Sequence, residues 1–348
     1  METSAVDKIA SPEDSADSTV LTVDSLTVEF SVGGQWRRAV DDLSFSVHKE
    51  ESVGIIGESG CGKTVTGLSI MRLLEEPPAR TSSGSIWFEG ADLVQASERE
   101  LRALRGRRMS LIFQDPMSSL NPVFTVGDQI SEVARLHLGI AKKPAWKRAE
   151  ELLGMVGIPA PARNARRYPH ELSGGMRQRV MIAMALVCEP SLLIADEPTT
   201  ALDSTVQLQI LDLLKDMQRQ FHLSLILVSH DLGVVQEAAD RVITMYSGQL
   251  VESGTVDQIM SGSVHPYTTA LMQSNPHHLG TQPKTQLASI PGTVPAVGEA
   301  IAGCRFGPRC GFVDERCTAE PVRIAQLEES RLVRCVRHEQ FLPGNAND

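Results

Sequence analysis

The sequence lacks a long hydrophobic run, and no stretch approaches the about 18 uninterrupted apolar residues that a membrane-spanning helix needs. Its longest apolar segments, such as residues 192–195 and 223–228, have only the length of a buried strand. If the protein serves a membrane, we therefore expect it to work from outside the lipid. Aromatic residues are also scarce, at 4% of the chain, and this scarcity favours no class of partner.

Basic residues are too few for a surface that binds nucleic acid throughout. The 33 Lys and Arg residues are outnumbered by 43 Asp and Glu residues, which gives a formal net charge of −10. Because binding to phosphates relies on clustered Lys and Arg, no nucleic-acid partner is expected. The net charge does not exclude a local basic patch.

The N-terminus lacks the features of a secretory signal. Residues 1–19 carry acidic and small polar residues where a signal peptide has a basic region followed by an apolar one. We expect a disordered leader on a cytoplasmic protein. The six cysteines are too sparse for a disulfide framework in a chain of 348 residues.

Hydrophobic periodicity predicts an α/β core. Alternation of apolar and polar residues over about residues 20–57 predicts an antiparallel, β-rich start. Two short apolar runs at residues 191–195 and 223–229 flank a helical pattern at about 204–220, which predicts a parallel βαβ unit. Helical signals are concentrated at about residues 115–172 and predict an inserted helical subdomain. From residue 265 onward long periodic segments give way to turn residues and cysteines, and we expect a small extension there.

A phosphate-binding loop is the first motif with a chemical meaning. Residues 57–64 read GESGCGKT, follow an apolar strand and precede a helical pattern, as the pattern G-x-x-x-x-G-K-[ST] requires. The glycines let backbone N–H groups curl around phosphate oxygens, and the helix N-terminus adds partial positive charge. Lys63 is predicted to meet the β- and γ-phosphates, and the Thr64 hydroxyl to ligate Mg²⁺. A glycine-rich turn with a chance lysine is the alternative. The predicted nucleotide-binding residues of this loop are Gly57, Ser59, Gly60, Cys61, Gly62, Lys63 and Thr64.

A second motif is a buried strand that ends in two carboxylates, Asp196 and Glu197. Burying carboxylates costs desolvation energy unless they face a cation or a polar site. Asp196 is predicted to hold Mg²⁺, directly or through water, and Glu197 to act as general base on the attacking water. That role is typically worth about 10²–10⁴-fold in rate. A solvated strand end is the alternative.

These two motifs leave GTPases, kinases and helicases open, and residues 172–178 (LSGGMRQ) narrow the choice. This segment is similar to the signature motif of the ABC ATPases. Other elements of that family follow in order: Gln114 in the segment FQDP, Asp203 in the segment ALD, and His230 after an apolar strand. The resemblance covers about residues 20–260.

The resemblance implies an α/β P-loop ABC ATPase fold, with a mixed sheet, an antiparallel β subdomain and an inserted helical subdomain. It places the nucleotide-binding domain at residues 20–264 and a Cys-rich extension at 265–348. It also implies a head-to-tail dimer that traps two ATP molecules, so that the Walker residues of one chain meet the signature motif of another. The signature residues expected at the partner's nucleotide are Ser173, Gly174 and Gly175.

Further roles in the site follow from the same resemblance. His230 would contact the γ-phosphate and help to hold the attacking water. Gln114 would take part in catalysis and couple Mg²⁺ to the surface that meets a transmembrane partner, while Asp203 would lie at the nucleotide. An aromatic ring usually stacks on adenine in this family; Phe30 best matches that position, and Trp36 is the fallback.

The signature carries Met176 where many members have Gln, and this departure narrows the family. Together with residues 195–203 (ADEPTTALD) and 265–268 (HPYT), it resembles the D-type ATPase of the dipeptide, oligopeptide and nickel permeases. That resemblance implies an Mg²⁺-dependent ATPase that powers peptide uptake from the cytoplasmic face of the membrane. It implies two transmembrane permease subunits, a second ABC ATPase and an extracytoplasmic substrate-binding protein as partners. The second ATPase is either a related F-type chain or an identical one, and nickel or another solute stays open as cargo.

Two other function classes compete with a transporter ATPase. A soluble ABC ATPase that acts on DNA or ribosomes would be expected to carry a long coiled-coil insertion, zinc modules or a second cassette, and none is visible in the sequence. A non-catalytic partner would be expected to lack Glu197, His230 or the signature serine. All three residues are present.

Four cysteines lie in the C-terminal extension, at Cys304, Cys310, Cys317 and Cys335, separated by 5, 6 and 17 residues. In a reducing cytoplasm such clustering favours a metal or cluster over disulfides. The spacing fits neither the common zinc pairing nor the bacterial ferredoxin pattern, so it leaves the metal open. The extension is similar to the C-terminal extension of this transporter family, and that resemblance implies a [4Fe–4S] cluster. Zinc and free thiols are the alternatives.

Overall fold

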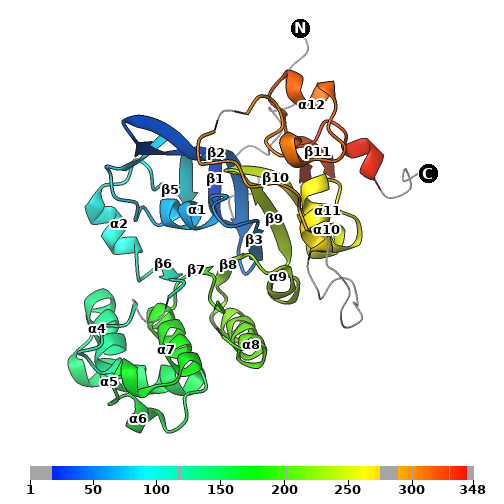
Figure 1. The fold of residues 1–348 in the computed structure, drawn as a ribbon. Helices are drawn as coiled ribbons and strands as arrows, with labels where there is room; N and C mark the ends of the chain where they lie inside the picture. Colours follow the sequence, from blue (N-terminus) through cyan, green and yellow to red (C-terminus); the bar gives the residue numbers. More distant parts are fainter. Residues whose placement is uncertain are drawn as a thin grey trace.

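The computed structural model describes residues 18–115, 119–200, 202–274, 289–299, 301–328 and 330–342. Two β-sheets form the centre of the molecule, a group of helices lies on one side, and the C-terminal segments lie on the other (Figure 1). The expected leader at residues 1–19 lies almost entirely outside the described residues, so it remains a prediction.

Four N-terminal strands form an antiparallel sheet, as their alternating pattern predicts. In spatial order they are β2 (Gln35–His48), β1 (Thr19–Val32), β4 (Ala79–Phe88) and β5 (Ala91–Asp92). Gly33 and Gly34 make the turn between β1 and β2 with φ angles of 60° and 78°, a region that glycine adopts without strain. The side chains of Leu21, Leu26 and Leu43 are fully buried between this sheet and the core.

A mixed sheet of eight strands forms the core. In spatial order its strands are β11 (Ala325–Glu328), β12 (Arg331–Val333), β10 (Gln249–Thr255), β9 (Arg241–Tyr246), β3 (Ser52–Ile56), β8 (Ser224–Ser229), β7 (Leu192–Asp196) and β6 (Met109–Ile112). The strands from β9 to β6 are parallel, whereas β10, β11 and β12 are antiparallel to their neighbours. The predicted βαβ unit is confirmed: β7 and β8 pair in parallel and are joined by helix α8 (Ser204–Phe221).

This strand order decides where the predicted site residues meet. The carboxyl ends of parallel strands lie at one edge of a sheet, and ligands bind there in open α/β sheets. The phosphate loop follows β3, the two carboxylates end β7, His230 follows β8, and Gln114 follows β6. The four segments therefore converge although they are far apart in the sequence.

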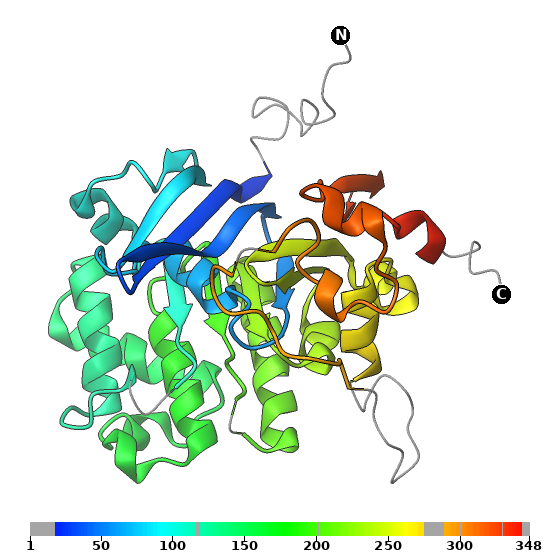
Figure 2. The same cartoon turned by 45° about the horizontal axis from the view of Figure 1, so that its top comes forward.

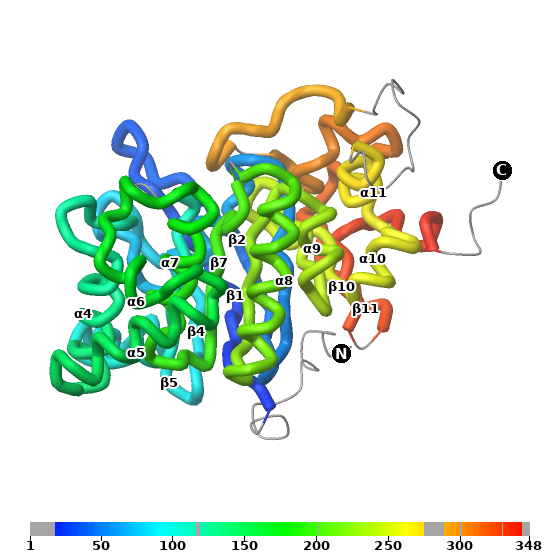
Figure 3. The backbone as a smooth tube through the Cα atoms, turned by 90° about the horizontal axis from the view of Figure 1, so that it is seen from below, coloured from blue at the N-terminus to red at the C-terminus, as the bar shows by residue number. Residues whose placement is uncertain are grey.

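The helices fall into two groups. The helical layer beside the sheet contains α4 (Val126–Leu138), α5 (Lys142–Met155), α6 (Pro161–Asn164), the 3-10 turn η2 (Pro169–Glu171) and α7 (Gly174–Leu186). Among the described residues up to 274, the other helices besides α8 are α1 (Lys63–Ile70), α2 (Glu98–Leu104), α9 (Leu232–Ala238), α10 (Val256–Gly262) and α11 (Pro266–Gln273). Ile130 of α4, Leu153 of α5 and Ile182 of α7 are fully buried in one apolar cluster. Helices α8 and α9 cover the sheet between this layer and the C-terminal segments (Figure 3).

The C-terminal extension joins the main sheet. Its remaining elements are the 3-10 turns η3 (Gly307–Arg309) and η4 (His338–Phe341) and helix α12 (Glu315–Ala319). Strand β12 pairs with β10, and β11 pairs with β12, so the extension completes one edge of the core sheet. Figure 2 shows the segment at residues 289–299, in orange, beside the core. The expected domain boundary at residue 265 remains a prediction.

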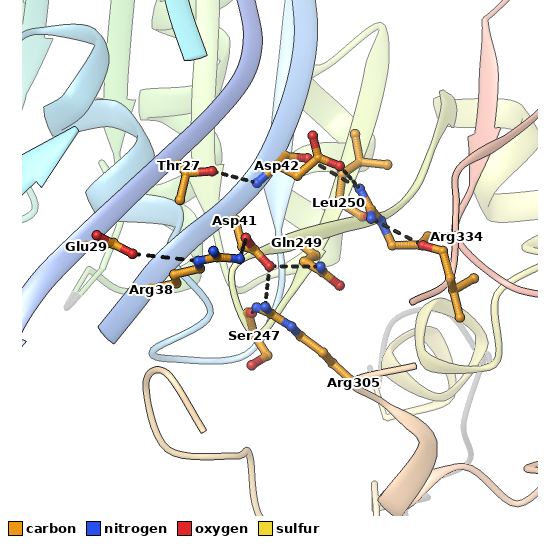
Figure 4. A network of polar contacts seen from close by, with 11 residues as sticks. Thr27, Glu29, Arg38, Asp41, Asp42, Ser247, Gln249, Leu250, Arg305 and Arg334 are labelled. Atoms are coloured by element: carbon orange, nitrogen blue, oxygen red, sulfur yellow. Dashed lines mark hydrogen bonds and ion pairs between the residues drawn. The ribbon is translucent and has the colours of Figure 1, made fainter. Parts of the chain in front are cut away.

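Arginines fasten the extension to the core (Figure 4). Arg305 forms an ion pair with Asp41 of β2 and donates a hydrogen bond to the carbonyl of Ser247. Arg334 donates to the carbonyl of Leu250 at 3.1 Å and to the carboxylate of Asp42 at 3.3 Å. Because these guanidinium groups are largely buried and paired, the extension is held in one orientation.

Candidate functional site

The phosphate loop adopts a backbone that only glycine accepts at three positions. Gly57, Gly60 and Gly62 have φ angles of 152°, 80° and 102°. A Cβ on Gly57 would lie 2.3 Å from the carbonyl oxygen of Met245, so close packing also excludes a side chain there. Helix α1 begins directly after Gly62 and has no side-chain cap at its N-terminus. Its first N–H groups are thus available to an anion.

Lys63 is buried and folds back over the loop. Its Nζ donates to the carbonyl of Gly57 at 2.7 Å and to the carbonyl of Glu58 at 3.1 Å. The sulfur of Cys61 lies 3.8 Å from the same Nζ, and burial raises the pKa of this thiol.

Asp196 and Thr64 form the predicted magnesium position. The Thr64 hydroxyl donates to the Asp196 carboxylate at 3.2 Å. Burial raises the pKa of Asp196, and the adjacent Glu197 adds to the rise, so the site favours a cation beside this carboxylate. A hydroxyl and a carboxylate oxygen are ligands that Mg²⁺ prefers, and the residues therefore fit the ion.

Glu197 is the centre of a polar cluster that the sheet edge brings together. It accepts hydrogen bonds from the Gln114 amide at 2.8 Å and the Thr200 hydroxyl at 2.9 Å, and its other oxygen lies 3.0 Å from Nδ1 of His230. Burial acts to raise the pKa of Glu197, but hydrogen bonds from His230 and Thr200 outweigh it and the net pKa is lowered. The carboxylate is therefore ionised at neutral pH and can accept a proton.

The backbone at Glu197 is left-handed, with a φ of 46°. Nine other non-glycine residues in the described part of the chain, among them Ser25 and His222, have φ angles between 43° and 61°, so the hydrogen bonds and not the backbone distinguish Glu197. The sequence assigns Thr200 no role, because a threonine in a turn carries no signal until its partner is known.

The signature residues lie at the start of a helix. The Ser173 hydroxyl caps α7 by accepting from the N–H of Met176 at 3.4 Å, and Asp203 caps α8 in the same way. Gly174 and Gly175 form the first turn, and a Cβ on Gly175 would lie 2.9 Å from Val206. Within the described residues no hydrogen bond or ion pair joins residues 173–175 to the phosphate loop of the same chain.

The two candidate adenine-stacking rings occupy different environments. Phe30 on β1 is partly buried against the apolar cluster that contains Cys61 of the phosphate loop. Trp36 is 42% exposed, and the guanidinium of Arg80 lies 4.0 Å from its ring centre. The assignment of Phe30 to adenine remains a prediction.

The four cysteines of the extension line one cavity. Its wall contains Cys304, Cys310, Cys317 and Cys335, together with Phe306. Burial raises the pKa of Cys304 and Cys310 and raises the pKa of Cys335 to about 11, so these thiols stay protonated when no cation is near. In the described part of the chain, no group of three or more His, Cys, Asp or Glu residues is arranged to hold a metal ion.

The other two cysteines do not line this cavity. Cys61 is buried in the phosphate loop, and Cys188 is buried in the core near the end of α7. A contact that the sequence does not suggest joins the loop to the extension: Arg309 forms an ion pair with Glu58. No sequence pattern marks such a pair, because its members are 251 positions apart.

The described residues contain no helix that is both long and apolar enough to cross a lipid bilayer. Two family profiles match the sequence. The profile of the ABC transporter family matches residues 40–200, and the profile of the oligopeptide/dipeptide transporter C-terminal region matches residues 251–317.

Curated relatives match almost the whole chain. The dipeptide transport ATP-binding protein DppD of Escherichia coli (strain K12) is 48% identical over 316 residues, which cover 91% of this chain and 96% of the relative. The oligopeptide transport ATP-binding protein AppD of Bacillus subtilis (strain 168) is 47% identical over 323 residues, which cover 93% of this chain and 98% of the relative.

Solved structures share the fold of the core. The dimeric structure of MJ0796, a bacterial ABC transporter cassette, has a TM-score of 0.61 at 26% identity and covers 68% of this chain and 98% of its own. The cassette cbiO1 from Clostridium perfringens, part of the transporter complex cbiONQ, has a TM-score of 0.60 at 26% identity. The match covers 70% of this chain and 91% of cbiO1.

Proposed function

The chain belongs to the ABC transporter ATP-binding proteins, and we propose that it hydrolyses ATP to drive the import of dipeptides or oligopeptides. The observation that carries the ATPase chemistry is the cluster around Glu197, beside the pair of Asp196 and Thr64. Peptide cargo rests on the two relatives, whose names state dipeptide and oligopeptide transport, and on the match of the C-terminal region. The second candidate function is that the chain hydrolyses ATP to drive the import of nickel.

The residues of the phosphate loop bind and orient the nucleotide. Lys63 and the N-terminus of α1 supply positive charge to the phosphates, and the glycines leave room for them. When bound at Thr64 and Asp196, Mg²⁺ neutralises charge on the phosphates. The ionised Glu197 accepts a proton from the attacking water, while His230 and Gln114 hold the carboxylate in place.

Glu197→Gln tests this assignment with little change of shape. The amide oxygen can still accept from Gln114 and Thr200, and the amide NH2 would then face Nδ1 of His230. The side chain takes up no proton, so we expect ATP binding to persist and turnover to fall about 10²–10⁴-fold. ATP hydrolysis and ATP affinity would be measured on the same preparation. Turnover equal to wild type would remove Glu197 from its role as base.

A transport assay addresses the cargo. The wild-type and Glu197→Gln chains would each be assembled with their permease subunits and binding protein in vesicles, and uptake of a labelled dipeptide and of nickel would be compared. We expect ATP-dependent dipeptide uptake that the substitution abolishes. Uptake of nickel in place of the dipeptide would favour the second candidate function.

We propose that two such ATPase chains, identical or related, sandwich two ATP molecules head to tail. In the described part of the chain no hydrogen bond or ion pair joins residues 173–175 to the phosphate loop, which supports a signature motif supplied by the partner. Two permease subunits would dock on the segment around Gln114, at the cytoplasmic face of the membrane. Exposed apolar side chains there support a docking surface: Phe113, Val123, Phe124 and Leu136 are 46%, 69%, 51% and 75% exposed.

We also propose that the four-cysteine cavity holds a [4Fe–4S] cluster. Four thiols that line one cavity are the donor type that such a cluster takes, whereas no three of them are arranged as a metal site in the described residues. Thiolate-only ligation also suits a single zinc ion, which four sulfurs hold at about 2.3 Å. Measuring the metal content of the protein therefore distinguishes an iron–sulfur cluster from a zinc ion.

Metal analysis of protein purified without oxygen tests the cluster. We expect about four iron and four sulfide per chain, with broad visible absorbance. Stoichiometric zinc without iron would leave the ATPase assignment intact and reject the cluster.

A further inference from the structure

One acidic side chain lies in the phosphate loop. Glu58 is the only acidic residue of residues 57–64, and its side chain is 25% exposed. A carboxylate beside a site for polyanionic phosphates weakens their binding unless its charge is compensated. Within the described residues, the cation paired with this carboxylate is Arg309 of the extension.

The pair between Glu58 and Arg309 has the geometry of a strong ion pair. Two guanidinium nitrogens of Arg309 donate to the two carboxylate oxygens at 2.7 Å and 3.0 Å. The Arg309 side chain is 5% exposed, so water screens the pair only weakly. Its Nε also donates to the carbonyl of Pro291 at 2.8 Å, which fixes the direction of the guanidinium.

Aromatic packing supports the same junction. The ring of Phe306 lies 5.3 Å from the ring centres of both Tyr246 and Tyr267. The hydroxyl of Tyr267 accepts a hydrogen bond from the N–H of Glu58 at 2.8 Å. The loop therefore rests on the extension through the backbone of Glu58 as well as through its side chain.

The segment that carries Arg309 also faces the four-cysteine cavity. Cys304 and Cys310 lie at its two ends and both line the cavity, as does Phe306 between them. The backbone N–H of Cys310 bonds to the carbonyl of Gly307, so the thiol and Arg309 sit on the same tight turn. A change in what the thiols bind would move this turn, and with it the partner of Glu58.

We propose that Arg309 is a positioning residue of the nucleotide site, which neutralises and orients Glu58, and that the turn it occupies makes nucleotide affinity depend on the state of the cysteine cavity. The proposal rests on the assignment of residues 57–64 to ATP. The two sites share one element that both contact, and coupling of this kind is reciprocal: whatever the cavity does to nucleotide affinity, nucleotide does to the cavity.

The first experiment measures the dissociation constant for Mg-ADP, which binds without turnover, on full chains purified without oxygen. We expect Arg309→Ala to weaken binding about tenfold, because an uncompensated carboxylate then belongs to the phosphate loop. Arg309→Lys keeps the charge but loses the two-pronged geometry, and we expect it to weaken binding about threefold. Glu58→Gln should bind as tightly as wild type or more tightly, and it should restore the Arg309→Ala variant to within about threefold of wild type.

Arg334→Ala is the matched control. Arg334 also precedes a cavity cysteine, its side chain is 9% exposed, and it bonds to β10 and β2 rather than to the phosphate loop. If loosening of the extension alone lowered affinity, this variant would bind Mg-ADP as weakly as Arg309→Ala. We expect its affinity to stay within about twofold of wild type.

The second experiment tests the coupling to the cavity. Cys310→Ser is compared in the wild-type and Glu58→Gln backgrounds, with Cys188→Ser, at a buried cysteine that does not line the cavity, as a control. We expect Cys310→Ser to weaken Mg-ADP binding about fivefold in the wild type and to have little effect once Glu58 is neutral. Thiol and metal content measured on each sample reports the state of the cavity independently of nucleotide binding.

Two results would overturn the proposal. One is wild-type affinity in Arg309→Ala; the other is a double variant as weak as Arg309→Ala, because the effect would then not pass through Glu58. If Arg309→Ala does not fold, Arg309→Lys and Cys310→Ser in the two backgrounds test the same dependence on Glu58. Failure of the wild-type chain to bind Mg-ADP would instead reject the assigned function, so the two failures are distinct.

Discussion

Removal of the Tyr267 hydroxyl is a small change that tests how the extension supports the phosphate loop. Tyr267 is fully buried, and its hydroxyl accepts the N–H of Glu58 at 2.8 Å. Burial raises the pKa of this hydroxyl, so it stays neutral at any working pH. Tyr267→Phe keeps the ring contacts with Tyr246 and Phe306 and removes this one acceptor.

The expected cost follows from the N–H that is left behind. A buried donor without a partner costs about 1–3 kcal/mol, and removal of the hydroxyl's own desolvation offsets part of it, which leaves about 1–2 kcal/mol. For a chain of this size we expect the melting temperature to fall by about 1–3 °C. Since the loosened residue belongs to the phosphate loop, we also expect Mg-ADP binding to weaken about fivefold.

Thermal unfolding and Mg-ADP titration of the full chain measure both effects. Tyr246→Phe is the control, because the Tyr246 hydroxyl accepts from the side chain of Arg309 at a longer 3.3 Å and supports no backbone N–H. The reasoning is refuted if Tyr267→Phe is as stable as wild type, or if both variants lose the same stability.

Two further predictions concern catalysis. In a complex of one Ser173→Ala chain and one wild-type chain, we expect hydrolysis to fail at the site built from the wild-type Walker residues; loss confined to the mutant's own Walker site would contradict the head-to-tail arrangement. Thr200→Val removes a hydrogen bond that lowers the pKa of Glu197. The lowered pKa contributes stability that is fully present above the unfolded value of about 4.5 and is lost as pH falls through the folded pKa. We therefore expect the acid limb of both stability and turnover to move to higher pH in this variant, as acid denaturation and rate profiles would measure. An unchanged acid limb would exclude Thr200 from that role.

The extension is more closely integrated with the core than its composition suggests. The sequence predicts a small Cys-rich segment after residue 265, whereas β12 pairs with β10 and extends the core sheet. The sequence does not predict this pairing, because β11 and β12 span only four and three residues, which is too short for a pattern of alternation to identify a strand. Arg331 even pairs with Glu252, which is fully buried in β10.

Much of the candidate site follows from local patterns. The loop at residues 57–64 and the carboxylates at the end of β7 are contiguous motifs, and each determines its own chemistry once a strand precedes it. Their partners follow only from a family resemblance. The hydrogen bonds from Gln114 and His230 to Glu197 span 83 and 33 positions, and no periodicity encodes them.

The sequence by itself determined the types of the elements and the chemical identity of the site. Alternation, apolar run length and glycine placement depend on neighbouring residues alone, and they specify strands, turns and a phosphate loop. Tertiary structure decided which of these segments meet, because the order β3-β8-β7-β6 is set by long-range packing. Tertiary structure also decided that Arg309 pairs with Glu58, which is 251 positions away in the sequence. This ion pair forms only because the folded sheet and the extension place both side chains next to each other.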